Sequence, residues 1–129
     1  MRRSLRRHAD VLPIANYLKS PGWAEGERWG RQVRVSRTVL DRIERQIPMR
    51  STGCRAVREM TQARPLSQWA ALGVVLTNGQ ALPRADLEAS LVRGVKQHFL
   101  VYRNYHALIE YNCSNSYAVA AGMLADRVG

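Results

Sequence analysis

The sequence has few acidic residues, a single phenylalanine and only two cysteines. Ten acidic side chains stand against twenty basic ones, eighteen of them arginine, so the net charge is +10. Such a balance favours anionic partners, namely nucleic acid, acidic membrane surfaces or a polymer that carries peptide carboxylates. Charge alone does not choose among these partners. Because most of the arginines are scattered along the chain, a solvated basic surface is the simplest interpretation.

Long apolar runs are also missing. The longest, residues 69–76, is interrupted by Gly73 and is too short to cross a bilayer, so no transmembrane helix is expected. Residues 1–8 are basic and are predicted to form an unstructured leader. They lack the apolar stretch that follows the basic start of a signal peptide, so no export signal is expected. With 46% apolar residues, the rest of the chain is long enough for one compact core.

Chemical motifs are scarce. Cys54 and Cys113 lie far apart, and neither they nor the three histidines show ligand spacing, so no metal site and no cofactor are expected. The spacing leaves the cysteines either as two buried thiols or as one long-range disulfide. No carboxylate lies in an apolar run of the kind that tunes an acid for catalysis, and pairing with nearby arginines is the simpler role. A P-loop, a dinucleotide fingerprint and a GxSxG motif are all absent.

The pattern of residues predicts an α+β fold in which helices flank a small antiparallel sheet. Helical patterns are expected at residues 10–19, from Thr38 (at capping-box spacing from Asp41) to Ile47, at 65–72 before Gly73, at 104–110, and from a cap at Ser114 to the end of the chain. Strand patterns are expected at residues 32–35, 74–76, 90–95 and 98–102, the last two as a hairpin. Residues 56–60 fit either a helical turn or a strand. The strand-rich part is therefore expected as a small insertion over residues 31–102.

One cluster of side chains suggests a binding function. It consists of aromatic and amide side chains close in sequence: Tyr102, Tyr105, Tyr111, Asn112, Asn115 and Tyr117. Aromatic faces stack on sugar rings, while amide and phenol groups hydrogen-bond to hydroxyl and N-acetyl groups. The alternative is that these tyrosines fill a core that contains one phenylalanine, and composition alone favours that alternative.

Several segments, in the right order, resemble the B-type lytic murein transglycosylases. The "ANYL" and "GW" motifs within residues 10–23 and the "WG" that follows at residues 29–30 match that family. So do residues 53–60 and 69–74, the tyrosine-rich segments 99–105 and 111–118, and the closing "LADR" at 124–127. The resemblance covers nearly everything after residue 8. It identifies residues 9–129 as the C-terminal portion of a lysozyme-like catalytic domain.

The resemblance implies an activity on peptidoglycan. Family members cleave the β-1,4 bond between N-acetylmuramic acid and N-acetylglucosamine and leave a 1,6-anhydromuramoyl end, with one glutamate acting first as acid and then as base. In the family this glutamate stands in a Glu-Ser-Gly motif upstream of the "ANYL" helix. No Glu-Ser pair occurs here, so no catalytic residue is assigned, and the chain is expected to be truncated and inactive alone. The alternative is a non-catalytic peptidoglycan-binding domain. Nucleic acid is not expected as a partner, since no recognition module is visible.

The family's groove residues correspond to Tyr17, Tyr111, Asn112 and Tyr117, which are therefore expected to bind the muramoyl unit. A branch of the family also has cysteines at the positions of Cys54 and Cys113, which favours a disulfide and a periplasmic location. The expected partner is the glycan strand of peptidoglycan. The oligomeric state is left open by the sequence.

Overall fold

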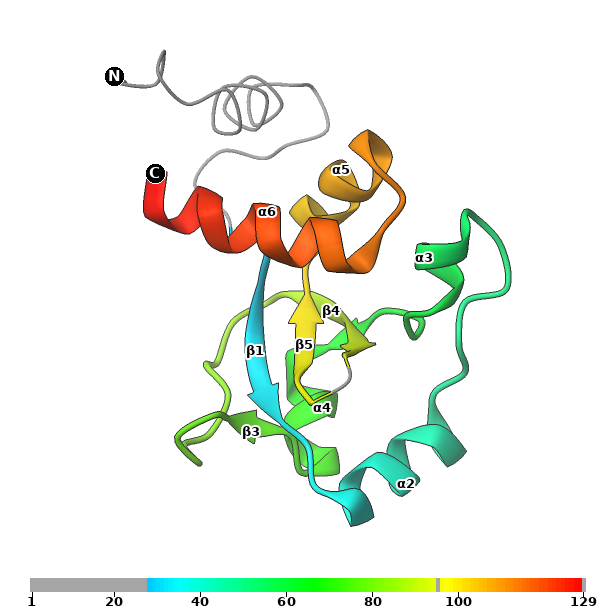
Figure 1. Ribbon diagram of the computed structural model, residues 1–129. Coiled ribbons are helices and arrows are strands. Elements are labelled where there is room, and N and C mark those ends of the chain that lie inside the picture. Colours follow the sequence, from blue (N-terminus) through cyan, green and yellow to red (C-terminus); the bar gives the residue numbers. More distant parts are fainter. Residues whose placement is uncertain (1–27, 95, 129) are drawn as a thin grey trace.

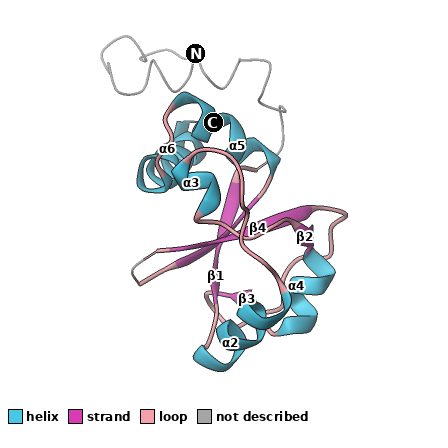
Figure 2. Ribbon diagram, turned by 90° about the vertical axis from the view of Figure 1, so that its right-hand side faces the viewer, coloured by secondary structure: helices cyan, strands magenta, loops and turns pink. Residues whose placement is uncertain are grey.

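The computed structural model describes residues 28–94 and 96–128 of the chain (Figure 1). The leader predicted at residues 1–8, the helix predicted at residues 10–19 and Tyr17 lie outside the described residues. Within the described part, helices lie on both sides of an antiparallel sheet, which confirms the α+β prediction (Figure 2). No helix in this part is long and apolar enough to cross a membrane.

The sheet contains five antiparallel strands in the order β2-β4-β5-β1-β3. Their bounds are β1 Gly30–Arg34, β2 Arg64–Pro65, β3 Val75–Leu76, β4 Glu88–Arg93 and β5 His98–Val101. The predicted hairpin is confirmed, with Leu91 of β4 opposite Leu100 of β5. Strand β1 then pairs with β5, although the two are separated by most of the described chain. The middle of the sheet is therefore built by contacts between residues distant in sequence.

One face of the sheet is covered by α2, Arg37–Gln46, and α4, Leu66–Leu72 (Figure 2). Alternate strand residues, including Leu91 and Leu100, pack here against buried side chains of both helices. Trp69 of α4 is fully buried, and its indole N–H donates to the carbonyl oxygen of Ala89 at 2.9 Å. This bond satisfies the one polar atom of the Trp69 side chain and fixes α4 on β4.

Three helices gather on the other side of the sheet: α3, Arg55–Arg58, α5, Arg103–Tyr111, and α6, Asn115–Val128 (Figures 1 and 2). Their buried side chains pack with Trp29 and with Phe99 and Val101 of β5. Helix α6 lies directly on Trp29, because a Cβ added at Gly122 would meet the indole ring at 2.5 Å. Gly122 therefore sets how closely the last helix approaches the sheet.

Local signals in the sequence were mostly sufficient to place helix ends. Gly73 ends α4 with a φ of 109°, as predicted, and Ser114 caps α6 by accepting a hydrogen bond from the Tyr117 N–H. The predicted start of α2 was wrong. Ser36 caps this helix by accepting from the Val39 N–H at 3.3 Å, so α2 begins before Thr38. Serine is a better N-cap than threonine, so the cap position falls on Ser36, two residues before Thr38.

Candidate functional site

The candidate site lies at the corner where α5 ends and α6 begins. Tyr111 is the last residue of α5, and Asn112 follows it as an extended cap. The chain then turns sharply, because the Ser114 N–H donates to the Asn112 carbonyl oxygen at 2.7 Å. This turn places the Tyr111 and Tyr117 rings together, with centroids 6.0 Å apart and planes at 23°. Three of the four side chains predicted for the groove, Tyr111, Asn112 and Tyr117, thus belong to one corner.

The two stacked tyrosines, called here the tyrosine platform, face solvent. Tyr111 is 50% exposed, Tyr117 is half-buried, and Asn112 is exposed beside them. Burial raises the pKa of the Tyr117 phenol, and the neighbouring Tyr111 raises it further. Tyr117 therefore keeps its proton at neutral pH and can donate as well as accept a hydrogen bond. Stacked aromatic rings that carry phenol groups, with an exposed amide nearby in sequence, suit a ligand with both apolar and hydroxyl-bearing surfaces, such as a sugar.

A disulfide holds the corner against α3. Cys113, the residue after Asn112, is bonded to Cys54, the residue before α3. Of the two arrangements left open by cysteine spacing, the structure contains the disulfide. The Ala56 N–H also donates to the Cys113 sulfur at 3.3 Å, and the Asn115 amide group donates to the Ala56 carbonyl oxygen at 3.0 Å. One covalent and two hydrogen bonds thus link the start of α6 to a segment nearly sixty residues earlier.

The remaining members of the aromatic and amide cluster belong to the protein interior next to the corner. Tyr102 and Tyr105 are buried, and the Tyr105 hydroxyl donates to Asn115 Oδ1 at 2.8 Å. Burial raises the pKa of Tyr105, so its hydroxyl stays a donor. Both the oxygen and the nitrogen of the Asn115 side chain form hydrogen bonds within the protein, so the role of this residue is structural. The core-filling interpretation holds for Tyr102 and Tyr105, while Tyr111 and Tyr117 remain at the surface.

A cavity of about 470 Å³ lies beside the start of α6. Phe99 and Val92 of the sheet form apolar lining, while Asn115 and Ser116 of α6 and Glu59 after α3 contribute polar atoms. This cavity could not be predicted from the sequence, because its residues come from three segments that are far apart in the chain. The lining of this cavity includes Asn115 of the corner, and its one carboxylate, Glu59, is exposed and paired with Arg55.

The described carboxylates have partners or face solvent. Three of them pair with arginine: Asp41 with Arg37 at 3.9 Å, Glu44 with Arg93 at 2.6 Å and Glu59 with Arg55 at 3.2 Å. Asp126 accepts from the Trp29 indole N–H at 2.9 Å. The others, Asp86, Glu88 and Glu110, are exposed. Across residues 28–94 and 96–128, no three His, Cys, Asp or Glu side chains are grouped as metal ligands would be.

Comparison with protein families matches residues 2–126 to the transglycosylase SLT domain. Among curated proteins, none matches the chain significantly. Several solved structures match the chain. SltB3 from Pseudomonas aeruginosa, in complex with NAG-anhNAM-pentapeptide, is 32% identical with a TM-score of 0.64, over 88% of this chain and 28% of that protein. Its complex with NAG-NAM-pentapeptide matches at 34% identity, with the same TM-score and coverage.

The Escherichia coli lytic transglycosylase Slt35, in complex with bulgecin A, matches at 24% identity with a TM-score of 0.55, over 92% of this chain and 33% of that protein. At this identity the likeness shows the fold alone. The chain thus spans about a third or less of the length of these solved proteins. The lysozyme-like transglycosylase fold predicted from the sequence is confirmed by both.

Proposed function

Because the chain belongs to the lytic transglycosylases with an SLT domain, we propose that its tyrosine platform binds the glycan strand of peptidoglycan. In the family that the sequence resembles, such a site serves cleavage of the β-1,4 bond between N-acetylmuramic acid and N-acetylglucosamine, with a 1,6-anhydromuramoyl product. The observation that carries the proposal is the exposed Tyr111–Tyr117 stack in a chain whose relative SltB3 was solved with NAG-anhNAM-pentapeptide.

The geometry of the corner supports a binding role for all three of its polar residues. The stacked rings offer an apolar surface to the face of a sugar, and the Tyr117 hydroxyl and the amide of the exposed Asn112 are groups that can hydrogen-bond to hydroxyl and N-acetyl groups. Since the disulfide and the Asn115 bonds fix the corner, little conformational entropy is lost when a ligand binds. Tyr17, outside the described residues, is proposed as a further contact of the same groove.

The proton donor of this reaction is proposed to be none of the described carboxyl groups. A general acid for glycoside cleavage must stay protonated near neutral pH, which requires an enclosed, poorly solvated position. The described carboxylates are instead exposed, paired with arginine or bonded to an indole. No Glu-Ser pair, the motif that carries the acid in the resembling family, occurs in the sequence. We therefore propose that this chain binds murein without cleaving it.

Sedimentation with purified murein sacculi tests the binding role. Tyr111→Ala removes one ring of the platform and is expected to weaken binding by roughly fivefold, the equivalent of about 1 kcal/mol. Tyr111→Phe keeps the ring and should retain most of the affinity. Met123→Ala is the matched control, since Met123 is a 43% exposed apolar residue on α6 and is not part of the platform. Equal losses for Tyr111→Ala and Met123→Ala would contradict the proposal.

Muropeptide analysis by mass spectrometry tests whether this chain contains the catalytic acid. Incubation of this chain with murein is expected to release no anhydromuropeptides. Their release, above a control with heat-treated protein, would show that a carboxyl group of this chain is the acid. The alternative is a stand-alone, non-catalytic peptidoglycan-binding domain, which fits the lack of a suitable acid among the described carboxylates. An in-frame Glu-Ser-Gly segment in the coding DNA upstream of Met1 would favour a protein that also cleaves murein over this alternative. A periplasmic location, where disulfides are stable, is part of the proposal.

A further inference from the structure

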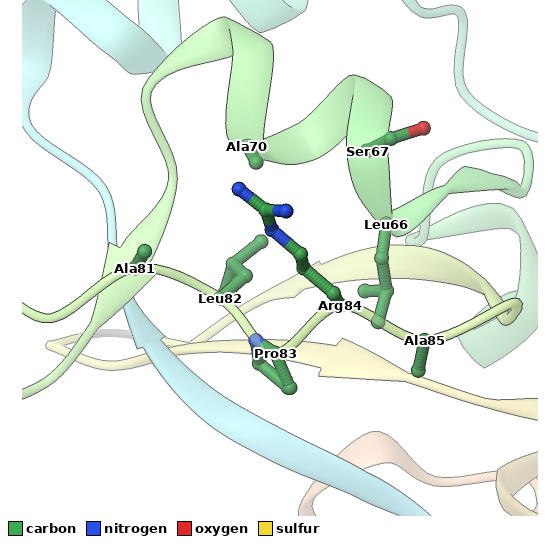
Figure 3. A pocket seen from close by; sticks show the side chains of 8 residues that line it. All are labelled: Leu66, Ser67, Ala70, Ala81, Leu82, Pro83, Arg84 and Ala85. Atoms are coloured by element: carbon green, nitrogen blue, oxygen red, sulfur yellow. The ribbon is translucent and has the colours of Figure 1, made fainter.

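A second cavity, of about 480 Å³, lies between α4 and the loop that leads from β3 to β4 (Figure 3). Leu66 and Leu82 are buried and form its apolar floor, while Ala70, Ala81 and Ala85 line its more exposed parts. The volume is in the range typical of sites for small ligands. Helices α5 and α6, which carry the tyrosine platform, lie on the other side of the sheet (Figure 2). This cavity is therefore separate from the candidate sugar site.

The walls of this cavity are held by bonds to the sheet. The Leu66 N–H donates to the Leu87 carbonyl oxygen at 3.0 Å, which joins the start of α4 to the end of the loop. The indole of Trp69 fixes the same helix to Ala89. At the other end of the loop, Ala81 forms a bridge with Val75. Both walls of the cavity are therefore held in place by the fold.

Arg84 supplies the charge at this site. Its side chain extends across the cavity, with the guanidinium group near Ala70 (Figure 3). Within residues 28–94 and 96–128, Arg84 forms no ion pair and no hydrogen bond. A guanidinium group presents parallel N–H donors that fit the two oxygens of a carboxylate. A cavity with small apolar walls and one such group suits a carboxylate attached to small apolar groups.

We propose that this cavity binds the free carboxyl end of a peptide with small apolar side chains, carried as a peptide stem by the same murein strand. The charge of Arg84 complements the terminal carboxylate, and the leucine floor with its alanine walls accommodates methyl-sized side chains. The identity of the peptide as a murein stem rests on the proposed function; its chemistry rests on the cavity itself. The peptide stem would thus bind on the face of the sheet opposite to the one that carries the tyrosine platform.

An NMR titration of the full ¹⁵N-labelled chain with N-acetyl-alanyl-alanine tests the chemistry. The amides of residues 66–70 and 81–85 are expected to shift with the acid, and much less with the same peptide as its C-terminal carboxamide. Arg84→Gln is expected to weaken binding of the acid about tenfold, the lower end for a charge-assisted hydrogen bond because the site is open. Arg58→Gln, at an exposed arginine of α3, is the matched control and should change nothing.

Equal binding of acid and carboxamide, or an unchanged affinity in Arg84→Gln, would overturn the proposal. Ala70→Phe, which fills the cavity and leaves the charge, should also abolish the shifts, and persistence of the shifts would place the ligand elsewhere.

Sedimentation with two kinds of murein separates this inference from the sugar site. Arg84→Gln should weaken binding to intact sacculi and leave binding to amidase-stripped, peptide-free glycan unchanged. Tyr111→Ala should weaken binding to both and leave the peptide titration unchanged. If Arg84→Gln affects the free peptide but not intact sacculi, the assignment to a murein stem is wrong. If Tyr111→Ala has no effect while Arg84→Gln does, the sugar site fails and the carboxylate site stands.

Discussion

Replacing Cys54 and Cys113 together by serine removes the covalent link between α3 and the corner that carries the tyrosine platform. The disulfide joins residues 59 positions apart, so it restricts a long loop of the unfolded chain. The chain-entropy relation gives about 4 kcal/mol for a loop of this length. Small domains are stable by only about 5–15 kcal/mol, so this single bond supplies a large part of the total. The double variant is expected to fold at 25 °C, with a melting temperature lower by roughly 15 °C.

Urea denaturation of the full chain, followed by tryptophan fluorescence, measures this difference. Three samples are compared: the oxidised protein, the same protein with reductant, and the Cys54→Ser/Cys113→Ser variant. The last two are expected to unfold at the same urea concentration, since serine is close to cysteine in size and can still accept from the Ala56 N–H. Reductant added to the variant is the control and should have no effect. A difference below about 1 kcal/mol between the oxidised protein and the variant would refute the loop-entropy reasoning.

Two further changes test the packing and the charges of the described part. Gly122→Ala places a methyl group 2.5 Å from the Trp29 ring, and overpacking of about 1–3 kcal/mol should exceed the roughly 1 kcal/mol gained in helix propensity. A lower urea midpoint is expected, and a higher one would contradict the close approach. Burial lowers the pKa of His106, with Arg50 lowering it further and Glu110 opposing. Neutral His106 therefore stabilises the fold fully above about pH 6.5, and this contribution is lost as the pH falls through the lowered pKa. His106→Gln should make stability less dependent on pH between 7 and 5, and an unchanged slope would contradict this assignment.

Much of the fold could be predicted because its signals are local. Asn78-Gly79 marks a turn in which Gly79 has a φ of 87°, and Gly73 ends α4 in the left-handed region. The hairpin of β4 and β5 follows from two apolar runs close in sequence. What could not be predicted depends on distant residues. The pairing of Arg64 with Ala89 and of β1 with β5, and hence the strand order, has no local signature.

The Arg84 cavity was missed for the same reason, because its floor combines α4 with a loop that carries no recognisable motif. A lone arginine among alanines and a proline resembles any surface loop in sequence. Its distinctive feature is the missing partner, which only becomes visible once the described side chains around Arg84 are placed.

The tyrosine cluster was open to two interpretations, core filling and sugar binding, and the structure shows buried members such as Tyr105 beside exposed ones such as Tyr111. Helical periodicity does not separate these two residues. Tyr111 lies four residues after Ala107 and three after Leu108, both buried, so on a continuing helix it would share their face. Tyr111 is nevertheless half exposed, because α5 ends at this residue and the chain turns away at Asn112. The end of the helix, more than the apolar pattern, therefore places the ring at the surface. The disulfide next to the turn then holds the exposed ring in place.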